Sequence, residues 1–202
     1  MYWDRVAKLY DFFEGISNKK VYEGTGKRVA EEIVAGDKVL ECACGTGAIS
    51  KYIAPKSRHL IATDFSDKML KEAAKKLRKF TNVSVEKENI TKLSYADESF
   101  DKVVAGNVIH LLDKPYAVIE ELMRVCKPGG KVIIPTYINM SGGRRSFIVK
   151  ILERSGAGFK RQFDMESYRA FFENAGYTDV KYDVVDGRMP CAIAIMGVGS
   201  NT

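Results

Sequence analysis

Two carboxylates flank a glycine-rich turn in the first half of the chain. Glu41 ends a short apolar run, Gly45 and Gly47 follow it, and Asp64 ends the next apolar run. A strand, a glycine turn and a helix, with a carboxylate about 20 residues further on, is the arrangement of an adenosine-cofactor site. The glycines let the main chain approach a ligand closely, and the helix N-terminus offers N–H groups. Asp64 would then accept hydrogen bonds from ribose hydroxyls.

The spacing of the glycines argues against a dinucleotide. A pyrophosphate-binding turn has the pattern G-x-G-x-x-G, but here Ser50 stands at the third glycine position. The segment 41–47 instead resembles the acidic-x-Gly-x-Gly-x-Gly loop of class I S-adenosylmethionine-dependent methyltransferases. Ala43 replaces the first glycine of that loop, and a residue this small still permits close approach.

Further segments resemble motifs of the same family, in the family's order. Segment 64–70 resembles the second-strand motif, whose acid binds ribose and whose next residues flank adenine. Segment 88–90 resembles the loop that meets the adenine amine. The amide oxygen of Asn89 could accept a hydrogen bond from that amine. Segment 107–112 resembles the loop that lines the methionine end. The cofactor-binding residues implied by this resemblance are Tyr10, Glu41, Ala43, Cys44, Gly45, Gly47, Asp64, Phe65, Met69, Asn89, Ile90 and Asn107.

Several of these residues also have a purely structural interpretation. Glu41 could cap a strand, and Asn89 could form a turn, as Asn often does. Met69 lies on an apolar helix stripe, so it could serve the core as well as the adenine.

His110 is the candidate catalytic residue. The resemblance places its loop near the transferred methyl group, where an imidazole could take a proton from an acceptor hydroxyl. The alternative is a structural or pocket-lining histidine. Three aromatic residues near the N-terminus, Tyr10, Phe12 and Phe13, are candidates for cation–π contact with the sulfonium.

The elements that must position these residues alternate between strands and helices. Apolar runs predict strands at 39–40, 59–63, 83–87, 100–105 and 132–137. Helices are predicted at 48–53 and at 115–125, and a further helix is predicted to begin after Ser66, which would cap it. The segment 127–130 is predicted to end the preceding helix before the fifth strand begins. A helix at 165–175 then precedes strands at 179–185 and 192–196, whose short connection permits only antiparallel pairing. The prediction is an α/β fold: a Rossmann-like, doubly wound, mostly parallel seven-stranded sheet with a C-terminal antiparallel hairpin.

Length and composition indicate one domain over residues 1–202, with a helical cap at 1–35 and a substrate lid at 138–163. Glycine pairs at both ends of the second segment would permit hinge motion, although a rigid crossover helix is the alternative. No apolar run could span a bilayer, the N-terminus does not resemble a signal peptide, and the four cysteines lack zinc-type spacing. We therefore expect a cytoplasmic protein with reduced thiols and no metal.

The family resemblance implies the activity. The segment 3–11 resembles the opening helix of the branch that contains the quinone-biosynthesis (type 11) small-molecule methyltransferases. It implies methyl transfer from S-adenosyl-L-methionine to O, C or N of a small molecule, with S-adenosyl-L-homocysteine as product. Such a displacement mainly needs an aligned nucleophile in a desolvated pocket.

Two other functions remain open. The net charge of +6 could indicate an RNA or protein substrate, although 106–109 lacks the Asn/Asp-Pro-Pro-aromatic motif of base amino methylation, so we expect no nucleic-acid partner. The other alternative is a non-catalytic, cofactor-binding partner subunit. The sequence does not indicate the oligomeric state.

Overall fold

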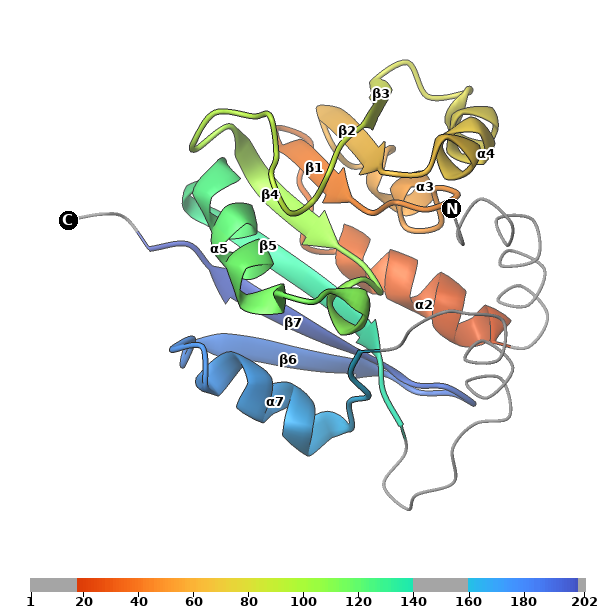
Figure 1. Cartoon of the computed structure of the whole chain (residues 1–202). Coiled ribbons are helices and arrows are strands. Elements are labelled where there is room, and N and C mark those ends of the chain that lie inside the picture. The colour runs from red at the N-terminus through yellow and green to blue at the C-terminus, as the bar shows by residue number, and fades with distance from the viewer. Residues whose placement is uncertain (1–17, 140–159, 200–202) are drawn as a thin grey trace.

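A seven-stranded sheet organises the part of the chain that the computed structural model describes, residues 18–139 and 160–199. Its order is β3-β2-β1-β4-β5-β7-β6 (Figure 1). Strands β1 to β5 are parallel, and β7 runs antiparallel to both β5 and β6. The predicted fold class is therefore confirmed. The strands are β1 (Lys38–Cys42), β2 (His59–Asp64), β3 (Val83–Lys87), β4 (Phe100–Ala105), β5 (Cys126–Tyr137), β6 (Val180–Val185) and β7 (Cys191–Gly197).

Helices cover both faces of this sheet (Figure 1). One face carries α2 (Lys19–Ala30), α3 (Ser50–Ile53) and α4 (Asp67–Leu77), and the other carries α5 (Pro115–Val125) and α7 (Met165–Glu173). The predicted cap is present at α4, where the Ser66 hydroxyl accepts a hydrogen bond from the Met69 amide. None of the helices in the described ranges is both long and apolar enough to cross a bilayer.

The alternation of side chains along β7 divides the core between the two faces. Ile193 and Ile195 pack with the cluster under α2, whereas Ala192 and Ala194 pack with the cluster under α7. The small alanine side chains face large aromatic ones there, among them the fully buried Tyr168. Small side chains beside large ones keep both layers of the core close-packed.

Several predicted boundaries were wrong, among them three that differ by two residues or more. Strand β5 begins at Cys126, directly after α5, instead of at 132. The segment 127–130 does not leave the sheet but forms an irregularity in it, because Phe100 pairs with Cys126 while Lys102 pairs with Lys131. Helix α3 begins at Ser50 rather than 48, since a turn over 45–49 precedes it, and α7 ends at Glu173 rather than 175.

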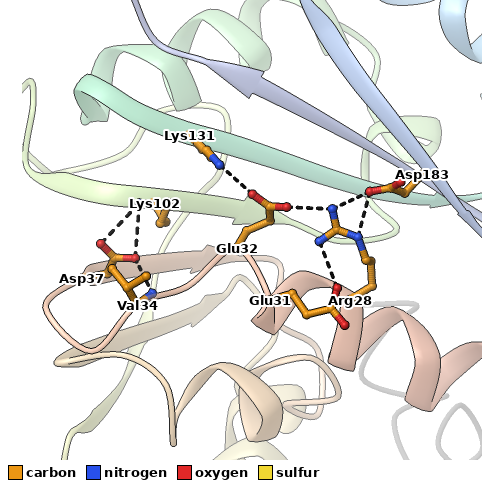
Figure 2. A network of polar contacts seen from close by, with 8 residues as sticks. All are labelled: Arg28, Glu31, Glu32, Val34, Asp37, Lys102, Lys131 and Asp183. Atoms are coloured by element: carbon orange, nitrogen blue, oxygen red, sulfur yellow. Dashed lines mark hydrogen bonds and ion pairs between the residues drawn. The ribbon is translucent and has the colours of Figure 1, made fainter.

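Ion pairs fix α2 against the strands of the second half of the sheet (Figure 2). Arg28 Nε donates to Asp183 Oδ2 of β6 at 2.8 Å, and its Nη2 lies 2.7 Å from Glu32 Oε1. Glu32 in turn lies 2.7 Å from Lys131 Nζ of β5. At the other end of the helix, the Asn18 side chain exchanges two hydrogen bonds with the main chain of Met189. One end of α2 is thereby tied to β6, and the other to the loop between β6 and β7.

Candidate functional site

The strand order reverses direction between β1 and β4, and a pocket opens there at the carboxyl ends of the strands. From β1 the chain continues to β2 and β3 on one side, while β4 and β5 extend the other side. Open α/β sheets bind ligands at such a switch point. The pocket brings together ten of the residues predicted to bind cofactor: Glu41, Ala43, Cys44, Gly45, Asp64, Phe65, Met69, Asn89, Ile90 and Asn107.

Main-chain amides hold the Asp64 carboxylate in place. Its Oδ2 accepts a hydrogen bond from Gly45 N and its Oδ1 accepts one from Ser66 N, each at 2.9 Å. The glycine turn and the start of α4 therefore orient the same carboxylate. A carboxylate oxygen can accept more than one hydrogen bond, so Asp64 can also accept from a diol.

Glu41 is a buried carboxyl group at the end of β1. Only 2% of its surface is exposed, and its Oε2 lacks a hydrogen-bond partner among the described residues. Burial raises the pKa of Glu41 to about 8; hydrogen bonding from Ser50 opposes that rise, and the nearby charge of Asp64 adds to it. Such a group needs a cation or a donor from outside the described residues, because a buried acceptor without a partner is costly.

The two small residues of the turn have different tasks. Ala43 adopts a left-handed backbone with φ of 52°, which glycine would adopt with less strain. Gly47 has φ of 80° and does not line the pocket. A Cβ atom on Gly47 would lie 3.3 Å from Leu77 Cδ1 and 3.5 Å from Ala73 Cα, so this glycine lets the turn pack closely against α4.

The two predicted asparagines make hydrogen bonds within the protein. Asn89 Oδ1 accepts from the amide of Thr91 at 3.0 Å and from its hydroxyl at 2.8 Å, which is the turn-forming role. Asn107 has φ of 53°, and its Oδ1 accepts from the Tyr137 amide at 3.1 Å. Asn107 thereby joins the end of β4 to the end of β5. An adenine contact by Asn89 stays a prediction, and it would have to share an oxygen that Thr91 already uses.

His110 lies on the 3-10 helix η1 (Ile109–Leu111), which follows β4. Its side chain is buried and is not part of the pocket wall, whereas its neighbour Leu111 is. Burial lowers the pKa of His110 to about 4. An imidazole with this pKa is neutral at pH 7 and is a weak base. The main-chain oxygen of His110 accepts from the amides of Lys160 and Arg161, at 3.0 and 3.2 Å.

Some of the predictions fall on other parts of the chain. Tyr10, Phe12 and Phe13 lie outside the described residues, as does 140–159 of the predicted lid. In the described ranges, no three His, Cys, Asp or Glu side chains are grouped to hold a metal ion.

Sequence reasoning missed the wall that α2 contributes. Tyr22 and Thr25 of α2, and Tyr137 at the end of β5, line the pocket. The signal for this wall was Gly24-Thr25-Gly26, because two glycines in a helix interior are unfavourable unless something must approach closely.

The pocket fits S-adenosylmethionine at the positions that carry charge. The Oε2 atom of Glu41 is a buried acceptor that the amino acid's ammonium group could satisfy. Asp64, held by two amides, suits the ribose diol, and the wall beyond it is apolar at Phe65, Met69 and Ile90. These features meet the needs of an adenosine joined to an amino acid.

Comparison with known proteins identifies methyltransferases as the similar proteins. A family model described as a methyltransferase domain, type 11, matches residues 40–134. A demethylmenaquinone methyltransferase of Clavibacter sepedonicus is 32% identical over 136 residues, 65% of this chain and 55% of that protein. One from Staphylococcus aureus is 26% identical over 204 residues, 89% of this chain and 84% of that protein.

A solved structure shows the same fold. A SAM-dependent methyltransferase from Aquifex aeolicus superimposes with a TM-score of 0.69 at 20% identity, covering 94% of this chain and 98% of that one. The family match, the relatives and the switch-point pocket agree with one another. Together these matches support a class I S-adenosylmethionine-dependent methyltransferase of the branch with the type 11 methyltransferase domain.

Proposed function

We propose that the chain transfers the methyl group of S-adenosylmethionine to a small-molecule acceptor held in the switch-point pocket. The observation that carries this proposal is Glu41, a buried carboxyl group whose Oε2 lacks a partner among the described residues where a ligand's ammonium group would lie. The bound cofactor supplies an electrophilic methyl group on a sulfonium sulfur.

The pocket residues would divide the cofactor among them. Glu41 would hold the ammonium group, and Asp64 would accept hydrogen bonds from the ribose hydroxyls. Phe65 and Met69, which follow Asp64, would flank the adenine. The remaining predicted residues would shape the wall by close approach: Ala43, Cys44, Gly45, Ile90 and Asn107.

The acceptor would be activated mainly by position. His110 is buried behind the wall and has a pKa of about 4, so it would take a proton poorly at neutral pH. The curated relatives are named as demethylmenaquinone methyltransferases, which supports a quinone-related acceptor for this chain. An acidic hydroxyl or enolisable carbon of such a ring would need little help from a general base. Val108 and Leu111 would supply an apolar surface for it.

Two measurements test the proposal. Calorimetry with S-adenosylhomocysteine and NAD should detect binding of the first alone. A screen of acceptor classes, with RNA as one arm, should then release S-adenosylhomocysteine with a small aromatic acceptor. Binding of NAD without S-adenosylhomocysteine, or turnover on RNA alone, would contradict the proposal. Turnover that needed an added protein would indicate a partner subunit.

A further inference from the structure

Helix α2 approaches its neighbours unusually closely at Gly24 and Gly26. A Cβ atom on Gly24 would lie 2.6 Å from Val185 Cγ1, and one on Gly26 would lie 2.2 Å from Tyr52 Cδ2. Each glycine costs a helix about 1 kcal/mol relative to alanine. Close packing against β6 and α3 therefore has a structural purpose here, which is to bring the residue between the glycines to a defined place.

That residue is Thr25. It is only 3% exposed, it lines the switch-point pocket, and its Oγ1 has no hydrogen-bond partner among the described residues. A threonine in a helix can donate to the carbonyl one turn earlier, but this hydroxyl does not. A buried hydroxyl on a pocket wall is therefore left for something in the pocket.

Thr25 and Glu41 both line the switch-point pocket, and α3 connects the elements that carry them. Gly26, next to Thr25, packs on Tyr52 of α3. Ser50, the first residue of α3, lies close enough to Glu41 to oppose the rise of its pKa. The short helix α3 thus lies between the wall with the Glu41 acceptor and the wall with the Thr25 hydroxyl, which can donate.

Two amides of the glycine turn are already engaged within the protein. Gly45 N donates to Asp64, and Gly47 N donates to the Cys44 carbonyl at 2.9 Å. The amino-acid half of the cofactor is a zwitterion, so it needs a donor for its carboxylate as well as an acceptor for its ammonium group. A charged Glu41 carboxylate only accepts hydrogen bonds, so it can serve the ammonium group but not the carboxylate.

We propose that Thr25 Oγ1 donates a hydrogen bond to the α-carboxylate of the cofactor, opposite the ammonium group at Glu41. This inference rests on the proposed function, since it assumes the same cofactor in the same pocket. Thr25 is thus a cofactor-binding residue that selects ligands with an intact amino acid.

The test compares two ligands on matched variants. Thr25→Val keeps the shape and removes the hydroxyl, and Thr25→Ser keeps the hydroxyl. Calorimetry should show S-adenosylhomocysteine binding to Thr25→Val weakened by roughly 10- to 150-fold, the range for a hydrogen bond to a charged group. 5′-Methylthioadenosine, which lacks the amino acid, should bind both variants as it binds the wild type. Thr25→Ser should retain most of the affinity for S-adenosylhomocysteine.

Each other outcome overturns a specific part. Equal loss for both ligands would mean that Thr25 only packs α2, and no loss for either would remove it from the site. Should Thr25→Val fail to fold by circular dichroism, Thr25→Ala is measured in the same way. A wild type that prefers S-adenosylhomocysteine to 5′-methylthioadenosine, with a Thr25→Val variant that keeps the same preference, overturns this inference alone. A wild type that binds neither ligand overturns the proposed function and this inference with it.

Discussion

Glu41→Gln should change how the stability of the protein depends on pH. Burial raises the pKa of Glu41 from 4.5 to about 8, so between these values the folded state holds a proton that the unfolded state has lost. Stability is then fully present below pH 4.5 and is lost as the pH rises toward 8. Each pH unit removes about 1.4 kcal/mol, and the whole interval about 3–5 kcal/mol. The uncharged amide of the variant would carry no such dependence.

A second buried group makes the comparison with the variant necessary. His110, whose pKa falls from 6.5 to about 4, has the opposite sign: it costs stability as the pH falls through that interval. Between pH 4.5 and 6.5 the two slopes oppose each other in the wild type. The difference between wild type and Glu41→Gln cancels the histidine and isolates the carboxyl group.

The assay is urea unfolding of both proteins at several pH values, without ligand. The free energy of unfolding of the variant, relative to that of the wild type, should rise steadily up to about pH 8 and then stay constant. Repeating the series with S-adenosylhomocysteine should reduce the wild-type loss, because an ammonium group beside Glu41 favours its charged form. Parallel curves for the two proteins would refute the reasoning, since they would mean that Glu41 ionises in the folded state as readily as in water.

Three further substitutions test other parts of the structure. Asp64→Asn should weaken S-adenosylhomocysteine binding roughly 10- to 150-fold in calorimetry, through loss of a charge-assisted bond to ribose, with circular dichroism unchanged; undiminished affinity would remove Asp64 from the site. His110→Leu should abolish about 3 kcal/mol of stability loss between pH 6.5 and 4 in urea unfolding, with turnover little changed; a large fall in kcat would instead identify a general base. Arg28→Met should lower the free energy of unfolding by about 2–4 kcal/mol, because Asp183 loses its ion-pair partner and Glu32 keeps only Lys131. Lys75→Met, which breaks only an exposed pair, should cost less than about 0.5 kcal/mol, and equal losses would contradict the distinction.

The sheet and the cofactor loop were predictable because their signals are local. Apolar runs mark the strands, and Ser66 caps α4 by a contact three residues away. The start of β5 was not predictable in this way. Proline and two glycines usually end an element, but here Gly129 N donates to Val198 O and Val198 N donates to Gly130 O, which keeps the segment in the sheet. A Cβ atom on Gly130 would also lie 2.7 Å from the main-chain oxygen of Asp101, so only glycine fits.

The wall formed by α2 depends on contacts that the sequence does not reveal. Gly24 meets Val185, and Arg28 meets Asp183, more than 150 residues further along the chain. Hydrophobic periodicity describes one helix at a time, so it could not show that Thr25 faces the pocket. The turn at Asn89, in contrast, is a local hydrogen-bonding pattern with Thr91, and the sequence analysis kept that interpretation open.

The burial of the pocket wall predicts where the cofactor's affinity resides. At the proposed amino-acid end, Glu41 and Thr25 are almost fully buried, and hydrogen bonds there would count for more because water does not compete. At the proposed adenine end, the Phe65 side chain is 49% exposed, and Lys87 Nζ lies 5.8 Å from the centre of its ring. Phe65→Ala should therefore reduce S-adenosylhomocysteine affinity less than removal of the amino acid does in 5′-methylthioadenosine. Calorimetry with both ligands decides this order. A larger loss from Phe65→Ala would place the main binding energy at the adenine and contradict the argument from burial.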